Sequence, residues 1–259
     1  MSEYDPDLYD AIYPGSLDGD LEWYRALAED AGAPVLELGA GTGRTVIPIA
    51  RAGIEIDALE LDVGMLARLE QRLAEEPEEV RQHVRLIPGD MRRFRLPRTY
   101  TLIQIPFRGF LHNITGEEQL TCLRCCRDHL RPGGLLALNV FHPSLDIMSE
   151  NRGALAGVWR WDGEATHPDG GVVICSQTTR YNTPRQRLTA RLRFEHFDEN
   201  GSLVHCHLQR LEVAYLYPGD VRALLEQAGF TDITIDGGFD GRPFANDGDE
   251  LVIRARKPA

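Results

Sequence analysis

The sequence lacks a long apolar run, an excess of positive charge and a dense set of cysteines. No segment approaches the roughly 18 apolar residues that a membrane-spanning helix needs. Residues 1–14 are acidic and rich in tyrosine, unlike the basic and then apolar start of a secretory signal peptide. We therefore expect a cytoplasmic protein that does not partner with a membrane.

Acidic residues outnumber basic ones. The 40 Asp and Glu residues against 28 Lys and Arg residues give a net charge of −12 at pH 7. A surface of that sign repels a phosphate backbone as well as an anionic lipid surface. The charge balance therefore predicts that nucleic acid is not a partner.

Cysteine is scarce, with five residues in a chain of 259. An odd number spread over this length is not typical of a disulfide framework. Cys122, Cys125 and Cys126 fall on one face of a predicted helix, where buried free thiols are the usual outcome. A metal is the alternative, but no Cys or His pair with finger-like spacing lies nearby, so we expect no metal site.

Strands and helices alternate through the first half of the chain. Short apolar runs bounded by glycine or proline predict strands at Val35–Leu38, Ile54–Leu59, Val84–Ile87, Tyr100–Ile105 and Leu135–Val140. Helical spacing predicts helices at Arg44–Arg51 and Val63–Glu75 between the first three strands, and the Thr115–Glu118 capping box begins the helix before the fifth strand. This alternation predicts an α/β fold with a doubly wound, mostly parallel sheet and helices on both faces.

After His142 the pattern changes to β-rich runs broken by Asp169-Gly170-Gly171 and Asn200-Gly201. We expect an inserted antiparallel β lobe, in which Asn200-Gly201 forms a two-residue turn and His196 lies opposite His205. A helix at Asp220–Ala228 and two final strands then return to the first domain. The expected units are an N-terminal segment at 1–33, a main domain at 34–148 and 217–259, and a lobe at 149–216.

A glycine-rich loop, Gly39-Ala40-Gly41-Thr42-Gly43, joins the first strand to the following helix. Open parallel sheets bind ligands at the carboxyl ends of their strands, which is where this loop presents backbone N–H groups. The dinucleotide fingerprint requires glycine at position 44, where Arg44 stands, and no Gly-Lys-Ser/Thr follows for a Walker loop. A nicotinamide-dependent oxidoreductase is therefore a disfavoured alternative.

Five segments carry a family resemblance in one order: VLELGAGTGR, ALELDVGML, LIPGDMRRF, YTLIQIPFRGFLHN and LRPGGLLALNVF. Across residues 34 to 141 the sequence resembles the class I S-adenosylmethionine-dependent methyltransferases. The resemblance implies a Rossmann-like fold with a seven-stranded sheet, S-adenosylmethionine as the cofactor, and methyl transfer as the activity. A module that binds S-adenosylmethionine or S-adenosylhomocysteine without catalysis is the alternative from another class.

The resemblance also implies a set of cofactor-binding residues. The loop glycines let the main chain approach the amino acid and ribose portions of the ligand, where a Cβ would clash. Glu60, at the end of the second strand, can accept hydrogen bonds from both ribose hydroxyls. Asp90 is placed for the adenine amino group, and the backbone N–H of Met91 is the complementary donor. The full set expected at the cofactor is Glu37, Gly39, Ala40, Gly41, Gly43, Arg44, Glu60, Leu61, Met65, Asp90, Met91, Ile105 and Phe107.

Each role has a structural alternative. The glycines can form a simple tight turn, Glu60 a solvated strand end and Asp90 a turn residue after Pro88-Gly89. Arg44 either contacts the methionine carboxylate or sits on an exposed helix turn.

A narrower resemblance concerns the acceptor side. YDAIY near the N-terminus, the β-rich insertion and the late GGFDGRPF are similar to amino-sugar N-methyltransferases, and GFLHN is similar to a glycine N-methyltransferase loop. This implies a small-molecule acceptor, a lid that includes Tyr13 and Tyr24, and an inserted sheet that often forms a homodimer. Aromatic packing is the alternative for both tyrosines. The loop at 106–109 departs from the Asn-Ser or Ser-Ser pair common in such enzymes, so the identity of the acceptor is not implied.

Two histidines follow strands at the ligand edge, His112 and His142. An amine acceptor must react in its neutral form and a hydroxyl acceptor must lose its proton, so a histidine near the methyl group is a suitable base. We expect a catalytic or acceptor-contacting role for either, with hydrogen-bonded packing as the alternative. An amine acceptor is favoured over a hydroxyl.

Overall fold

The computed structural model describes residues 5–13, 17–150, 157–167, 170–246 and 248–259. The helices in these ranges are α1 Pro6–Ile12, α2 Asp20–Ala31, α3 Val46–Arg51, α4 Val63–Ala74, α5 Glu78–Arg81, α6 Gly116–His129, α7 Leu145–Glu150 and α8 Pro218–Ala228, with short 3₁₀ turns η1 Gly109–His112 and η3 Thr183–Arg185. The strands are β1 Val35–Leu38, β2 Ile56–Glu60, β3 Val84–Pro88, β4 Tyr100–Ile105, β5 Leu130–Phe141, β6 Arg160–Thr166, β7 Val172–Asn182, β8 Arg187–Phe197, β9 Leu203–Ala214, β10 Thr231–Asp236 and β11 Glu250–Arg256.

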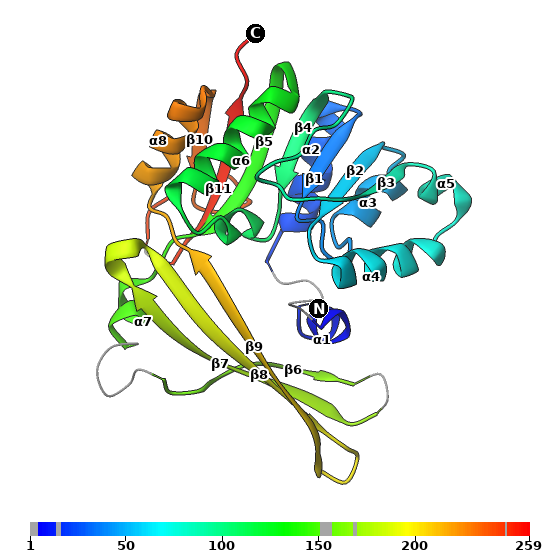
Figure 1. Ribbon diagram of the computed structural model, residues 1–259, viewed down its shortest axis with the longest axis vertical. Helices are drawn as coiled ribbons and strands as arrows, with labels where there is room; N and C mark the ends of the chain where they lie inside the picture. The colour runs from blue at the N-terminus through cyan, green and yellow to red at the C-terminus, as the bar shows by residue number, and fades with distance from the viewer. Residues whose placement is uncertain (1–4, 14–16, 151–156, 168–169, 247) are drawn as a thin grey trace.

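The main domain is built on a seven-stranded sheet in the order β10-β11-β5-β4-β1-β2-β3 (Figure 1). Strand β11 is antiparallel to both of its neighbours, whereas the pairs among β1 to β5 are parallel. The predicted doubly wound, mostly parallel fold with an inserted antiparallel lobe is confirmed. The parallel strands end at one edge, which is where open sheets of this kind bind ligands.

Alternate residues of each central strand pack on opposite faces of the sheet. Leu36 and Leu38 of β1 join a core with α6 and α8, whereas Val35 joins a second core with α2, α3 and α4. Cys122 and Cys126 of α6 are free, buried thiols in the first core, as predicted, whereas the free thiol Cys125 is only half-buried. No helix in the described ranges is long and apolar enough to cross a membrane.

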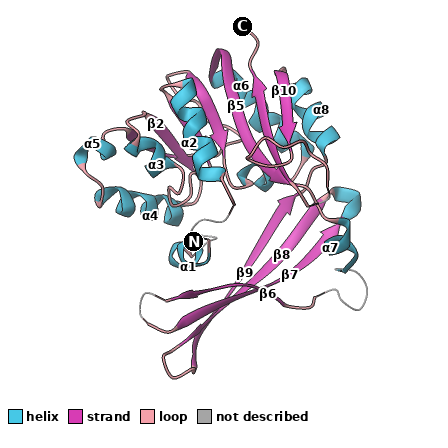
Figure 2. Ribbon diagram, turned by 180° about the vertical axis from the view of Figure 1, so that it is seen from behind, coloured by secondary structure: helices cyan, strands magenta, loops and turns pink. Residues whose placement is uncertain are grey.

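The four-stranded antiparallel sheet, in the order β6-β7-β8-β9, forms a separate lobe beyond the ligand edge. Figures 1 and 2 show it from two sides, with α1 lying between the lobe and the main sheet. Leu8 of α1 packs among Val173, Cys175, Leu192 and Phe194 of the lobe. The N-terminal helix therefore belongs to both halves of the molecule.

The turn between β8 and β9 differs from the prediction. His196 does pair with His205, but the strands then shift register and a five-residue connection, 198–202, replaces the two-residue turn. Asp198 organises this loop because its carboxylate accepts the backbone N–H groups of Asn200 and Ser202, each at 2.9 Å. This Asx-type interaction offers the backbone an alternative to the tighter hairpin.

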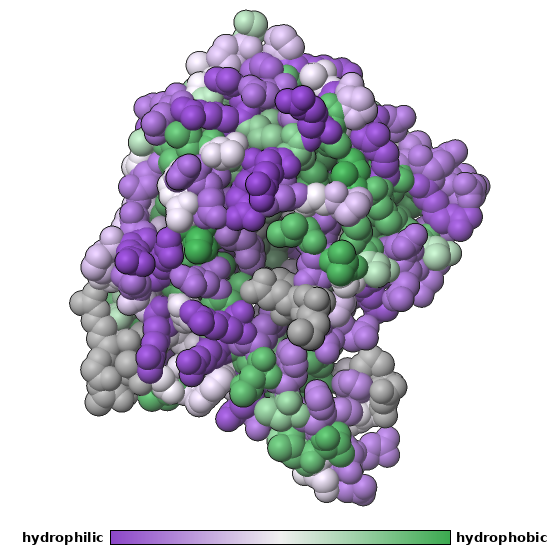
Figure 3. Space-filling view, in the orientation of Figure 1, coloured by the Kyte–Doolittle hydropathy of each residue, from purple (hydrophilic) through white to green (hydrophobic). Residues whose placement is uncertain are grey.

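Exposed apolar side chains gather at the far end of the lobe (Figure 3). Strand β9 is an edge strand, and its Leu203, Val204 and Leu208 are 51%, 54% and 65% exposed. Val204, Cys206 and Leu208 alternate along the strand and therefore share one face. Cys206 is exposed as well, so these three side chains form a continuous exposed stripe on β9.

A buried carboxyl group joins β1, β4 and the start of α3. Glu37 is 1% exposed, and its two oxygens accept hydrogen bonds from Thr45 Oγ1 at 2.5 Å and Gln104 Nε2 at 2.6 Å. Burial raises the pKa of Glu37 to about 7. Within the described residues Gln104 Oε1 has no hydrogen-bond partner, so rotation of this amide would give a protonated Glu37 an acceptor. Glu37 therefore lies beneath the glycine loop, with both oxygens already used.

We expect Glu37→Gln to change how stability depends on pH. A carboxyl group whose pKa is raised by folding contributes stability below its unfolded pKa of about 4.3, and this contribution is lost as pH rises through about 7. Relative to the wild type, the variant should therefore gain stability between pH 5 and pH 8, on the order of 1–3 kcal/mol. Urea denaturation at several pH values measures this difference. The exposed Glu22→Gln is the matched control, and a pH-independent loss of stability in Glu37→Gln would contradict the assignment.

Candidate active site

The glycine loop after β1 lies against two methionines. A Cβ built on Gly39 would lie 3.3 Å from Met91 Cε, and one on Gly41 would lie 3.7 Å from Met65 Cε. Gly43 has a φ of +87°, and a Cβ there would come within 2.1 Å of a Leu69 methyl carbon on α4. Glycine is therefore required at position 43 by backbone conformation and by the close approach of α4.

Glu60 ends β2 directly beside this loop. One carboxylate oxygen accepts from the backbone N–H of Gly41 and the other from that of Asp62, both at 2.8 Å. The residue is 9% exposed, and desolvation raises the pKa of its carboxyl group. Each oxygen keeps a second acceptor direction, because an ionised carboxylate offers about four lone-pair sites. The carboxylate is held in place while it can still accept from a ligand.

Asp90 follows the neighbouring strand β3. Glu60 pairs with Pro88, and the Gly89 N–H donates to the Glu60 carbonyl at 2.9 Å, so the two acidic residues leave adjacent strands at the same edge. Arg92 donates to Asp90 Oδ2 at 2.7 Å, and this hydrogen bond lowers the pKa of the Asp90 carboxyl group. The sequence analysis did not identify Arg92, although its position two residues after an acidic turn residue is a usable signal.

Helix α1 covers the glycine loop. Thr42 Oγ1 donates to Asp10 Oδ1 at 2.6 Å, and Arg68 of α4 donates to Asp10 Oδ2 at 3.1 Å. On the same helix, the Tyr9 ring lies edge-on to Phe107 with centroids 6.3 Å apart. Sequence reasoning singled out neither Tyr9 nor Asp10, although both belong to the YDAIY segment that marked the lid.

Arg44 links the loop to α2 and to Phe107. Its guanidinium group donates to both oxygens of the buried Asp20, at 2.9 and 2.5 Å, and lies 5.0 Å from the Phe107 ring centroid. The Arg44 side chain is 13% exposed, which does not fit the exposed-helix-turn alternative. Phe107 and Arg108 have φ values of +51° and +63°, so a sharp turn after β4 directs Phe107 toward the loop. Two such residues in succession are often found at functional sites.

The remaining predicted cofactor contacts divide by exposure. Met65 is 4% exposed and faces the loop, whereas Leu61 is 63% exposed at the rim. Ala40 and Ile105 are buried. Ile105 is the last residue of β4, and Phe107 follows it two residues later. The rings of Tyr9, Tyr13 and Phe107 contact one another and form an aromatic cluster beside the glycine loop.

Three predicted site residues are placed differently from the expectation. Tyr24 is fully buried and its hydroxyl donates to Asn139 Oδ1 at 2.8 Å, so it matches the aromatic-packing alternative and not a lid. Glu37 is enclosed below the loop, as described above, and does not face a ligand. His142 is 7% exposed, with its ring centroid 5.4 Å from that of Tyr217 and 5.0 Å from that of Phe244, which matches packing.

His112 lies at the exposed end of the short turn that follows β4. It ends η1, beside β5 and β9, and its side chain is exposed. Desolvation by the surrounding chain nevertheless lowers the pKa of its imidazole. His112 is therefore neutral at neutral pH and able to accept a proton.

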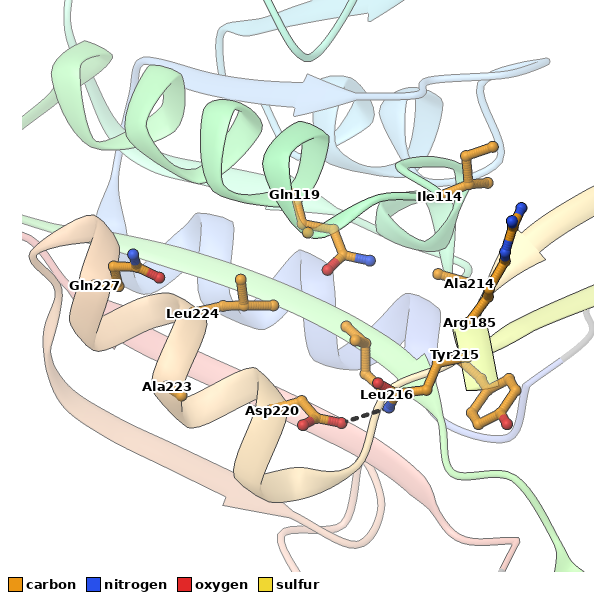
Figure 4. A pocket seen from close by; sticks show the side chains of 12 residues that line it. Ile114, Gln119, Arg185, Ala214, Tyr215, Leu216, Asp220, Ala223, Leu224 and Gln227 are labelled. Atoms are coloured by element: carbon orange, nitrogen blue, oxygen red, sulfur yellow. Dashed lines mark hydrogen bonds between the residues drawn. The ribbon is translucent and has the colours of Figure 1, made fainter. Parts of the chain in front are cut away.

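A separate cavity of about 270 Å³ lies between α6, α8 and the lobe (Figure 4). Two of the lining residues are hydrogen-bonded, because the Gln186 side chain donates to Asp220 Oδ2 at 2.7 Å. None of the predicted site residues lines this cavity. The lining residues are Ile114, Gly116, Gln119, Arg185, Gln186, Ala214, Tyr215, Leu216, Asp220, Ala223, Leu224 and Gln227. This cavity is therefore distinct from the glycine-loop site.

Comparisons with known proteins agree with the geometry of the site. Residues 36–136 match a family model described as a methyltransferase domain. The chain is 23% identical to the cypemycin N-terminal methyltransferase of a Streptomyces species, over 93% of this chain and 89% of that protein.

Two solved structures share the fold. The CcbJ methyltransferase from Streptomyces caelestis gives a TM-score of 0.74 at 23% identity, covering 93% of this chain and 96% of that one. The S-adenosylmethionine-bound CalS10, an amino pentose methyltransferase from Micromonospora echinaspora, gives 0.67 at 23% identity, covering 92% and 88%. This chain carries a methyltransferase domain, and it is a methyltransferase whose cofactor is S-adenosylmethionine.

Proposed function

We propose that this enzyme methylates an amine of a small molecule. The observation that carries the proposal is the convergence of the Glu60 carboxylate, the glycine loop and Met91 at the edge that α1 covers. The amine is supported by the names of two relatives, an N-terminal methyltransferase and an amino pentose methyltransferase. His112, whose imidazole pKa is lowered by desolvation, is the proposed base, because an amine reacts only after it has lost its extra proton.

The described residues fit the cofactor. Glu60 has free acceptor directions for two ribose hydroxyls, and Met65 and Met91 offer apolar surface for the adenine. Asp90 remains the proposed acceptor for the adenine amino group. Arg92 already donates to both Asp90 oxygens, so this contact requires the Arg92 side chain to shift or the carboxylate to share an acceptor site. Arg44 and Phe107 lie on the side proposed for the methionine portion.

When bound, S-adenosylmethionine would supply a methyl carbon on a sulfonium sulfur. A nucleophile that attacks this carbon in line with the carbon–sulfur bond would displace the sulfur. We propose that Tyr9, Tyr13 and Phe107 exclude water from this point and help to orient the acceptor. Such alignment can supply on the order of 7–11 kcal/mol. His112 takes the proton of the amine, helix α1 acts as the lid, and the strands β6 to β9 of the lobe shape the acceptor side.

The acceptor class is tested by methyl transfer from labelled S-adenosylmethionine. Amino sugars and short peptides with free N-termini are compared with the corresponding hydroxyl compounds. We expect label in the amines alone. Label only in hydroxyl compounds would contradict the amine proposal, and no transfer to either set would favour a binding module.

We expect Glu60→Ala to weaken S-adenosylmethionine binding by about 1–3 kcal/mol, because a charge-assisted contact to the ribose is lost. Calorimetric titration measures the affinity. Glu70→Ala removes an exposed carboxylate from α4 and is the control. Wild-type affinity in a folded Glu60→Ala protein would remove Glu60 from the site.

His112→Gln should lower the rate with an amine acceptor by about 100-fold or more, the usual contribution of a general base. In the wild type, kcat/KM should rise with pH through a value below the ordinary histidine pKa, since the desolvated imidazole loses its proton early. The variant should lose this limb of the pH profile. A profile with the same limb in both proteins would show that another group accepts the proton.

We also propose a homodimer that forms through β9. An edge strand with an apolar stripe at Val204, Cys206 and Leu208 offers both unpaired backbone groups and apolar area to a second copy. Leu208→Lys should convert the dimer to a monomer in sedimentation velocity, whereas Glu199→Lys in the adjoining loop should leave it intact. A wild-type protein that sediments as a monomer would rule out this interface.

A further inference from the structure

Asp162 occupies a β-bulge in the lobe. Trp161 pairs with Ser176 and Gly163 with Cys175, so Asp162 is the extra residue on β6. A bulge bends the strand and redirects a side chain, and such bulges are common beside active sites. Here the redirected carboxylate reaches Cys175 and Gln177 of β7 on the face that α1 covers.

Three neutral donors surround this carboxylate. The Tyr13 hydroxyl donates to Oδ2 at 2.9 Å, the Gln177 amide donates to Oδ1, and the Cys175 thiol lies 3.8 Å from Oδ2. Burial and the nearby carboxylate raise the pKa values of Tyr13 and Cys175, the latter to about 12, so both remain protonated. None of the Arg, Lys or His residues in the described ranges forms an ion pair with Asp162.

The charge stands beside the aromatic cluster of the proposed site. Tyr13 extends from Asp162 to a ring contact with Phe107 at 6.2 Å and with Tyr9 at 5.5 Å. A cation placed next to Asp162 would therefore meet the carboxylate beside the Tyr13 side chain, which belongs to the aromatic cluster. Arg44, whose guanidinium group lies over the Phe107 ring, is paired with Asp20 and not with Asp162.

We propose that Asp162 is the recognition residue for the acceptor, and that it selects molecules that arrive as protonated amines over isosteric hydroxyl compounds. The inference rests on the proposed amine methyltransfer and adds the group that distinguishes the two acceptor classes. Asp162 acts in binding and orientation. The proton that the amine must lose before it attacks the methyl carbon goes to His112, as proposed above.

Two probes of equal shape and different charge test this. Binding of cyclohexylamine, protonated at pH 7.5, and of cyclohexanol is titrated by NMR against the protein saturated with S-adenosylhomocysteine. We expect the wild type to prefer the amine, and Asp162→Asn to lower amine affinity at least tenfold with little change for the alcohol. Glu164→Gln, two residues along the same strand and exposed, is the control and should keep the preference.

Asp162→Glu distinguishes loss of the charge from a purely structural effect. It keeps the carboxylate and should therefore retain most of the preference for the amine. Affinity for S-adenosylhomocysteine should be unchanged in all three variants, which shows that the main domain is intact. If Asp162→Asn keeps the wild-type preference for the amine, the inference about Asp162 is overturned and the amine proposal stands. If the wild type binds both probes equally, the amine proposal and the inference fail together.

Discussion

The hydrogen bond from the Gly41 N–H to the Glu60 carboxylate joins the two strand ends on which the site depends. It ties the loop after β1 to the end of β2, and the Glu60 carbonyl in turn accepts from Gly89 at the end of β3. Three consecutive parallel strands are thereby held in register at the edge where the chain can approach a ligand. The sheet supplies rigidity, while the loop supplies a surface without side chains.

The N-terminal helix unites the two halves of the molecule through a few contacts. Asp10 anchors it to the glycine loop and to α4, Leu8 packs in the lobe, and Tyr13 reaches the lobe's Asp162. A helix of seven residues has little stability of its own, so tertiary contacts must hold it in place. Its position therefore depends on both the main domain and the lobe.

The charged side chains near the glycine loop and those in the lobe have different partners. Arg92 neutralises Asp90 and Asp20 neutralises Arg44, so the cofactor side contains paired charges. In the lobe, Asp162 is surrounded by neutral donors. Glu37 below the loop is buried among neutral partners too, but it is closed to any ligand. Carboxyl groups at these positions thus differ in charge partner and in access to a ligand, because their exposure and neighbours differ.

The sequence by itself determined the order of strands and helices, the glycine loop and the two acidic strand ends. These features are local, since apolar periodicity, glycine spacing and turn residues depend on neighbours in the chain. The tertiary structure decided which side chains are open. Tyr24 and His142 are enclosed by residues about 75 to 115 positions away, and Asp162 meets Tyr13 across a separation of 149 residues. Such burial and partnership arise only when distant elements pack together, so no local pattern encodes them.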